Sequence, residues 1–211
     1  MHSVCASLEF YPTPGGFMAA LRTTLSALAL GLAILAGCTP VTTPTPLPQP
    51  SPTCTPEAGG TPYTCTPYQY EEMVAKDRLY TEAETVYRKY LTEEARIYRA
   101  GGVTEPTPVL LETTTGKYQS DAMEIFRDLV ELKVRVLSGD YTVSWIRRTP
   151  GPARSGSVVA LTSCVDGSKV RFSDGKGGSE TGTPIQETGY FVVVEGSLKL
   201  ANADSKVVPT C

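Results

Sequence analysis

Two stretches of the chain repeat apolar residues every three or four positions, which is the spacing of an amphipathic helix. The first runs from Tyr70 to Arg99, and Gly101 and Gly102 then favour a helix end. The second runs from Tyr118 to Leu132, with Ser120 as the expected N-cap. The apolar positions are Leu79, Ala83, Val86, Tyr90 and Ile97 in the first helix and Ala122, Ile125, Phe126, Leu129 and Val130 in the second.

After the second helix the apolar period changes to two, which is typical of strands. The predicted strands are Tyr141–Ile146, Val158–Cys164, Lys169–Phe172, Thr188–Glu195 and Leu198–Val208, with turns at Asp166-Gly167, Asp174-Gly175 and Glu195-Gly196. Helices followed by antiparallel strands predict an α+β domain over residues 68–211. We expect a curved antiparallel sheet that wraps around the long N-terminal helix, with the second helix packed on it.

The beginning of the chain has the pattern of an export signal. Met18 to Arg22 is a short positive segment, and Leu25 to Ala36 is an apolar run that is shorter than the roughly 20 residues of a transmembrane helix. The lipobox of lipoprotein signal peptidase is matched by Leu35, Ala36, Gly37 and Cys38. We expect cleavage before Cys38 and lipidation of its thiol, which places the protein on the extracytoplasmic face of the cell membrane. The alternative is an ordinary secreted protein with a chance cysteine.

Residues 1–37 are accordingly expected to be lost from the mature protein. His2 to Phe17 contains no lysine or arginine, so we expect translation to start at Met18. Residues 38–67 follow the lipidated cysteine, and the 29 residues from Thr39 to Pro67 include nine prolines and nine threonines. This composition predicts a disordered, polyproline-like tether without helix or sheet. The tether is either a plain spacer or a substrate for O-glycosylation.

Four of the six cysteines remain once Cys5 and Cys38 are set aside. In an oxidising compartment four thiols allow three pairings. We favour a bridge inside the tether and a second one inside the domain, and the alternative of a zinc site lacks C-x2-4-C spacing. The favoured pairs are Cys54–Cys65 and Cys164–Cys211.

Composition restricts the chemistry of the domain. The net charge is −3, which gives no electrostatic reason to expect nucleic-acid binding. The single histidine is His2, in the discarded leader, so histidine-based catalysis and histidine-containing metal sites are excluded from the mature protein. No cofactor is expected. Ser173-Asp174-Gly175-Lys176 fits S-x-x-K, but its glycine-rich context predicts a turn instead of a nucleophile.

The first helix is rich in tyrosine. These side chains either line a pocket or dock a partner, or they pack against the sheet. A pocket enzyme would need an ionisable residue that faces a closed apolar cavity, for example Asp128 or Asp140. Three arginines form a local basic cluster in the sequence, which is either a contact for wall polymers or phospholipid, or solvated charge at a strand end. The tyrosines are Tyr80, Tyr87, Tyr90 and Tyr98, and the arginines are Arg147, Arg148 and Arg154.

From Tyr70 to Cys211 the chain resembles small actinobacterial lipoproteins with an NTF2-like (cystatin-like) domain. The lipobox, the Thr/Pro tether, the tyrosine-rich helix, the stretch Leu161-Thr162-Ser163-Cys164-Val165-Asp166 and the C-terminal Cys211 carry this resemblance. It implies a cone-shaped half-barrel around a helix, with a pocket. We therefore expect a non-catalytic lipoprotein that binds an envelope protein or a small apolar ligand. The alternatives are a hydrolase- or isomerase-type pocket enzyme and a phage- or plasmid-borne surface-exclusion lipoprotein.

Overall fold

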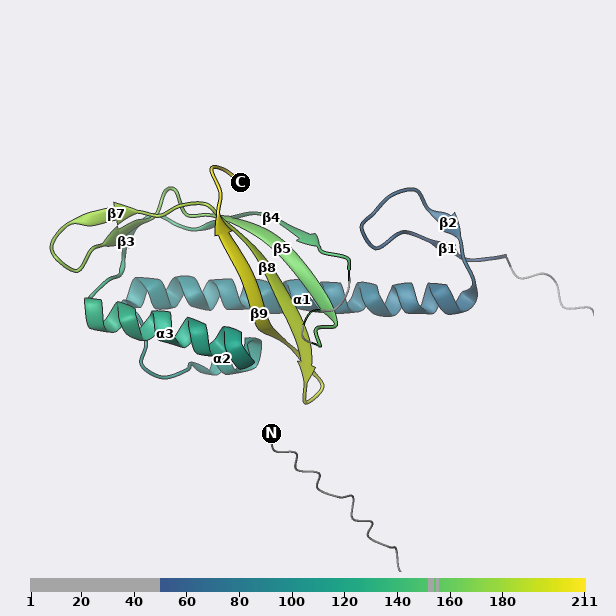
Figure 1. Ribbon diagram of the computed structural model, residues 1–211, viewed down its shortest axis with the longest axis horizontal. Coiled ribbons are helices and arrows are strands. Elements are labelled where there is room, and N and C mark those ends of the chain that lie inside the picture. The colour runs from purple at the N-terminus through teal and green to yellow at the C-terminus, as the bar shows by residue number, and fades with distance from the viewer. Residues whose placement is uncertain (1–49, 152–153, 155) are drawn as a thin grey trace, which may run out of the picture. The chain divides into compact units, whose positions relative to one another are not determined.

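The computed structural model describes residues 50–151, 154 and 156–211. The leader, Leu35, Ala36, Gly37 and Cys38 lie outside the described residues. Within the described part the fold is α+β, as predicted: three helices are followed by strands that pair only with antiparallel neighbours (Figure 1).

Helix α1 spans Pro67–Ala100 and begins three residues before the predicted Tyr70. Thr66 is the N-cap: its hydroxyl accepts a hydrogen bond from the Gln69 amide, and the Gln69 side chain accepts one from the Thr66 amide. This reciprocal capping box and a proline at the first helical position start the helix ahead of the apolar stripe. The helix ends where expected, at Gly101, which has a positive φ of 84°.

Two further helices follow. Helix α2, Pro108–Thr113, was not predicted; Thr107 caps it by accepting a hydrogen bond from the Leu110 amide. Helix α3 spans Gly116–Leu132, so the predicted start at Tyr118 was late and Ser120 as N-cap was wrong. Thr115 holds the N-cap position, because its amide donates to the Leu200 carbonyl of the last strand and so ties the helix start to the sheet.

The main sheet has four antiparallel strands in the order β4-β5-β8-β9. All four were predicted to within a few residues, and the β8–β9 turn at Glu195-Gly196 uses positive φ at both residues. A smaller sheet has the order β3-β6-β7, and its outer strands β3 and β7 were not predicted. The bounds are β3 Val136–Ser138, β4 Thr142–Arg148, β5 Val159–Asp166, β6 Arg171–Ser173, β7 Ser179–Thr181, β8 Ile185–Val194 and β9 Ser197–Val207.

The core lies between one face of the main sheet and the helices. In Figure 1 the four strands cross over α1, and α3 runs alongside α1. The helical stripe buries Tyr80, Ala83, Tyr87, Tyr90 and Ile97, which meet inward residues of the strands and of α3. The main partners are Phe126, Val159, Leu161, Phe191, Leu198 and Leu200.

Part of the predicted tether is folded, which corrects the expectation of a segment without sheet. β1 (Thr53–Cys54) and β2 (Tyr63–Thr64) form an antiparallel hairpin. The Cys54–Cys65 disulfide closes the hairpin and buries both sulfur-bearing side chains. Proline removes amide donors, but a covalent bridge and the Gly59-Gly60 turn let a short ladder form between the prolines.

The second predicted bridge, Cys164–Cys211, is also present. It links β5 to the last residue of the chain, and the Trp145 indole of β4 donates a 3.1 Å hydrogen bond to the Cys211 carbonyl. The C-terminus is therefore held against the outer face of the main sheet, since Cys164 pairs with Trp145 in the strand register.

Candidate functional site

A cavity of about 120 Å³ lies between the long helix and the inner face of the main sheet. Helix α1 contributes four of its residues, α3 contributes one, and the strands with their flanking loops contribute the rest. Two of the lining residues are carboxylates and four are tyrosines. The lining is Tyr87, Leu91, Glu94, Tyr98, Tyr118, Tyr141, Val165, Thr183, Ile185 and Glu187. We call it the Tyr–Glu cavity.

Tyrosine hydroxyls hold both carboxylates. Tyr87 donates to Glu187 Oε1 at 2.9 Å, and Tyr118 donates to the same atom at 3.4 Å. Tyr90 donates to Glu94 Oε1 at 2.7 Å from behind the lining. The Tyr87 oxygen lies 2.8 Å from Ser163 Oγ; because its proton goes to Glu187, Ser163 is the donor in that contact.

The carboxyl groups have unusual acidities. Burial raises the pKa of Glu94 to about 7, the negative charge of Glu187 adds to the rise, and the Tyr90 hydrogen bond opposes it. Burial also raises the pKa of Glu187, against hydrogen bonds from Tyr87 and Tyr118 that favour the charged form. Two carboxyl groups whose pKa values are raised by burial beside a cavity are a feature of functional sites.

The geometry of α1 explains how four side chains reach one cavity. Tyr87, Leu91, Glu94 and Tyr98 are spaced by four, three and four residues, so they lie along one side of the helix. On β8, Ile185 and Glu187 point to the same face because side chains alternate along a strand. These spacings were the available signal for Glu94 and Glu187, which the sequence reasoning missed.

Aromatic rings pack around Tyr98 in the wall of the cavity. Tyr98 has ring centroids 6.0 Å from Tyr141, 5.9 Å from Phe126 and 6.0 Å from Phe172. Phe172 belongs to β6, so the small sheet supports the cavity wall through these edge contacts.

The two sequence hypotheses for the tyrosines are each correct for part of the set. Tyr87 and Tyr98 line the cavity. Tyr90 is buried behind it, and Tyr80 packs under the Arg148 guanidinium, outside the cavity. Neither carboxylate suggested for a pocket enzyme faces the cavity: Asp128 is exposed, and Asp140 is exposed and pairs with Arg99.

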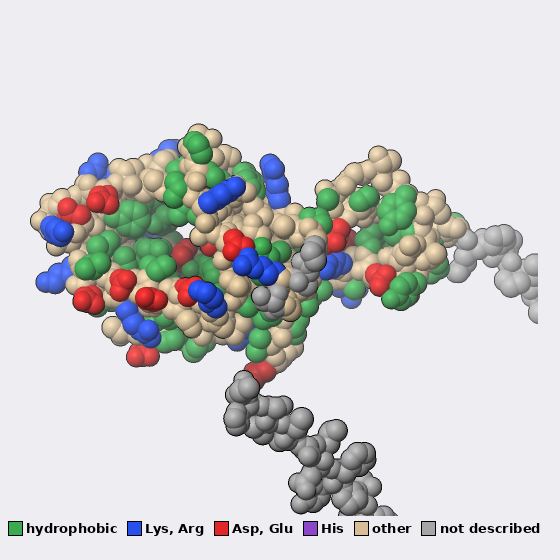
Figure 2. Space-filling model, viewed as in Figure 1, with side chains coloured by type: hydrophobic (Ala, Val, Ile, Leu, Met, Phe, Trp, Pro, Cys, Tyr) green, Lys and Arg blue, Asp and Glu red, His purple; other side chains and the backbone are tan. Residues whose placement is uncertain are grey.

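The three arginines of the predicted basic cluster each have a separate partner. Arg148 pairs with Asp77, Arg154 pairs with Asp204, and Arg147 stacks over Trp145. Figure 2 shows acidic and basic side chains interspersed on the visible face. The S-x-x-K segment forms the turn expected for it: Asp174 accepts hydrogen bonds from the amides of Lys176 and Gly178.

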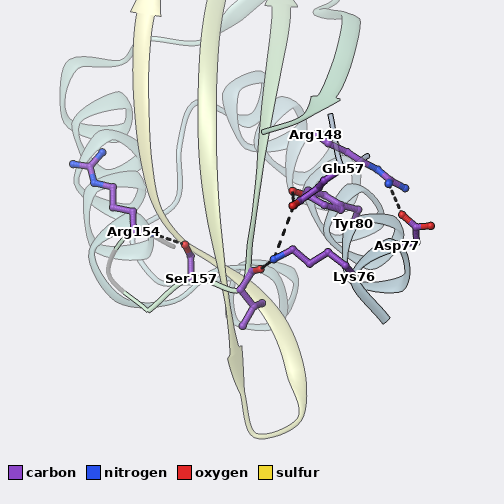
Figure 3. A network of polar contacts seen from close by, with 8 residues as sticks. Glu57, Lys76, Asp77, Tyr80, Arg148, Arg154 and Ser157 are labelled. Atoms are coloured by element: carbon purple, nitrogen blue, oxygen red, sulfur yellow. Dashed lines mark hydrogen bonds and ion pairs between the residues drawn. The ribbon is translucent and has the colours of Figure 1, made fainter. Parts of the chain in front are cut away.

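A second polar cluster joins the hairpin to α1 (Figure 3). Tyr80 donates a hydrogen bond to Glu57 of the hairpin, and Lys76 lies 4.0 Å from the same carboxylate while donating to the Val158 carbonyl at 2.7 Å. Among the described residues, Glu57, Lys76 and Tyr80 pair with one another or with the backbone, so the cluster docks the hairpin on α1.

None of the helices in residues 50–211 is long and apolar enough to cross a bilayer. Within the same described part, no three His, Cys, Asp or Glu side chains are grouped so that they could hold a metal ion.

No protein-family model and no curated protein matches the chain. Among solved structures it is similar to the intermembrane space region of the chloroplast protein ARC6, with 13% identity and a TM-score of 0.43 over 60% of this chain and 95% of that one. A de novo designed β-sheet protein solved by NMR has 10% identity and a TM-score of 0.35 over 61% of this chain and 92% of the design. Similarities this low carry no argument about function.

Proposed function

We propose that the protein is an extracytoplasmic lipoprotein, held on the membrane by lipidated Cys38, whose NTF2-like domain binds a small ligand in the Tyr–Glu cavity without transforming it. The observation that carries the ligand proposal is the cavity itself, a space of about 120 Å³ that two carboxylates and four tyrosines line. Small-molecule sites are concave and mostly apolar, with a few converging polar groups. The lipobox residues in the sequence support the anchor.

Native mass spectrometry tests the ligand proposal. The full chain, produced in an exporting host and extracted in a non-ionic detergent, is compared under native and denaturing conditions. An adduct that is lost on denaturation and absent from a Leu91→Trp variant supports a ligand in the cavity, because the larger side chain fills that space. Absence of any adduct, together with no binding from an extract of the native host's envelope, contradicts it.

The anchor is tested separately by fractionation. Wild-type chain is expected in the membrane fraction and resistant to salt extraction, whereas Cys38→Ala is expected to lose incorporation of labelled palmitate. A matched Cys54→Ala change, which removes a cysteine outside the lipobox, is expected to leave labelling unchanged. Equal palmitate incorporation in the Cys38→Ala variant contradicts the anchor.

A pocket enzyme is the second candidate, and one observation favours it. Glu94 has a pKa of about 7 beside the cavity, which suits a general base at neutral pH. Incubating the recovered ligand with wild-type protein distinguishes the two functions. Binding alone leaves the ligand mass unchanged, whereas a hydrolase or isomerase yields a product of different mass or retention time that is lost in Glu94→Gln.

A further inference from the structure

We propose that the Tyr–Glu cavity takes a small organic cation, such as an alkylammonium or a quaternary ammonium ion. This inference rests on the proposed function, since it assumes that the cavity holds a ligand. Its first support is the sign of the charge: the lining contains Glu94 and Glu187 and no lysine, arginine or histidine. An anionic ligand would be repelled by both carboxylates in a site of low dielectric.

The second support is the free oxygen on each carboxylate. Tyr87 and Tyr118 both bond to Oε1 of Glu187, and Tyr90 bonds to Oε1 of Glu94. Neither Oε2 atom has a hydrogen-bond partner among the described residues. Every fully buried side-chain oxygen in this part of the chain does have a partner, so the two Oε2 atoms cannot be fully buried. Both atoms are therefore accessible, and they belong to residues that line the cavity. They are acceptors without a donor, which an ammonium group supplies.

The third support is the aromatic wall. Tyr87, Tyr98, Tyr118 and Tyr141 surround the carboxylates, and aromatic rings attract cations through their negative faces. Leu91, Val165 and Ile185 complete the wall and suit methyl or methylene groups. Aromatic rings, carboxylates and aliphatic side chains together match an ion whose charge is surrounded by carbon. A bare metal ion would need more oxygen ligands than two carboxylates offer.

Repulsion between the two carboxylates points the same way. The two half-buried carboxylates line the same cavity, and the negative charge of Glu187 raises the pKa of Glu94. A bound cation offsets both charges at once. A neutral ligand of the same shape fills the space but leaves the repulsion in place.

The volume restricts the size of the ion. An engineered cavity of about 150 Å³ in another protein binds benzene, which has six carbon atoms. The Tyr–Glu cavity, at about 120 Å³, is therefore expected to take a cation or cationic head of about four to seven non-hydrogen atoms. Tetramethylammonium, choline and butylammonium are suitable probes.

Isothermal titration calorimetry at pH 8 tests the proposal on the full chain in non-ionic detergent. The probes are methylammonium, butylammonium, tetramethylammonium and choline, and 3,3-dimethylbutan-1-ol is the neutral isostere of choline. At least one cation is expected to bind with a Kd below 10 mM. If choline is that cation, its isostere is expected to bind at least tenfold more weakly; for another cation, the comparison uses the alcohol of equal chain length or branching.

Variants that remove a charge test whether the cation binds in the Tyr–Glu cavity. Glu187→Gln is expected to weaken binding of the cation tenfold or more, and Leu91→Trp to abolish it. Glu71→Gln removes a charge from an exposed position of the same helix α1 and is expected to leave the Kd within twofold. Circular dichroism checks that each variant is folded, and the comparison of cation with neutral isostere needs no variant.

The outcomes separate this inference from the proposed function. Equal affinity for cation and isostere, both lost in Leu91→Trp, overturns the cation proposal while the cavity remains a ligand site. A neutral or anionic adduct in native mass spectrometry does the same. Failure of every probe to bind, with no adduct, overturns both.

Discussion

The hydroxyl of Tyr87 lies 2.9 Å from Oε1 of Glu187, although the two residues are 100 positions apart in the chain. This bond joins α1 to β8 at the wall of the Tyr–Glu cavity, and Ser163 of β5 extends it to a second strand. Three elements are thus fixed relative to one another by side-chain oxygens. The cavity keeps its shape because the groups that line it also hold it together.

Removing the Tyr87 hydroxyl is expected to destabilise the domain. Tyr87→Phe leaves the ring in place but deprives Glu187 and Ser163 of a partner, which costs about 1–3 kcal/mol when the groups stay buried. Urea unfolding followed by circular dichroism measures the change. Tyr68→Phe, at a side chain that is 68% exposed, is the control and is expected to have no measurable effect. Equal urea midpoints for the two variants would contradict the role of the bond.

Stability is expected to fall as pH rises through the pKa of Glu94. The folded-state pKa is about 7 against an ordinary value of 4.5, so between these values the folded state binds more protons than the unfolded state. The favourable contribution of protonated Glu94 to the free energy of unfolding is complete below about pH 4.5 and is lost above about pH 7.

Glu94→Gln is therefore expected to unfold at higher temperature than wild type at pH 8, by the equivalent of about 1–3 kcal/mol, and to differ little at pH 4.5. Tyr90, Tyr98, Tyr118, Tyr141 and Glu187 surround Glu94, and the tyrosines stay neutral across this range because burial raises their pKa values. Glu71→Gln is the matched control. A Glu94→Gln curve that runs parallel to wild type from pH 4.5 to pH 8 would show that Glu94 does not titrate there.

Gly102, which follows α1, is expected to tolerate no side chain. Its φ is +96°, and a Cβ atom there would lie 2.2 Å from the Phe126 carbonyl oxygen of α3. Gly102→Ala must move α3 away from α1 and is expected to cost more than 3 kcal/mol. Gly196 has a φ of +78° with nothing within 4 Å of its Cβ position, so Gly196→Ala should cost only about 1–2 kcal/mol of backbone strain. Similar melting temperatures for the two variants would contradict the close packing of α3 on α1.

The two disulfides are expected to contribute unequally to the stability of the domain. Cys164–Cys211 spans 47 residues, so loss of the bridge in a Cys164→Ala, Cys211→Ala double variant is expected to cost about 4 kcal/mol in the chain-entropy model. Cys54–Cys65 spans 11 residues, and its loss is expected to free the hairpin from α1. Because the hairpin contacts α1 away from the Tyr–Glu cavity, loss of the Cys54–Cys65 bridge is expected to change the melting temperature of the main domain little. Thermal unfolding combined with limited proteolysis near residue 60 distinguishes the two results, and equal losses in melting temperature would contradict this division.

Local patterns in the sequence predicted the two long helices and the strands of the main sheet. Period-3.6 apolar spacing predicted α1, period-two alternation predicted the four strands of the main sheet, and the Glu195-Gly196 turn joins two of them as expected. These features depend on neighbours within a few residues, so they can be read directly. The favoured cysteine pairs also followed from the division between tether and domain.

Predictions from neighbouring residues were wrong or missing where a contact with a distant part of the chain decides the conformation. The start of α3 depends on the bond between Thr115 and Leu200, and the hairpin between prolines depends on a disulfide and on its docking to Tyr80. The small outer strands β3 and β7 are too short to show a period and exist only because β6 pairs with both.

The sequence by itself therefore determined α1, most of α3, the four strands of the main sheet and their order, because each is encoded by residues close together in the chain. Only the tertiary structure brought Glu94 to Glu187, which are far apart in sequence and unremarkable as single acidic residues. Their meeting depends on the register of β8 in the sheet and on the face that α1 turns toward it. Burial then changes the acidity of both carboxyl groups, and no sequence pattern contains that effect, since it arises from the surroundings that folding creates.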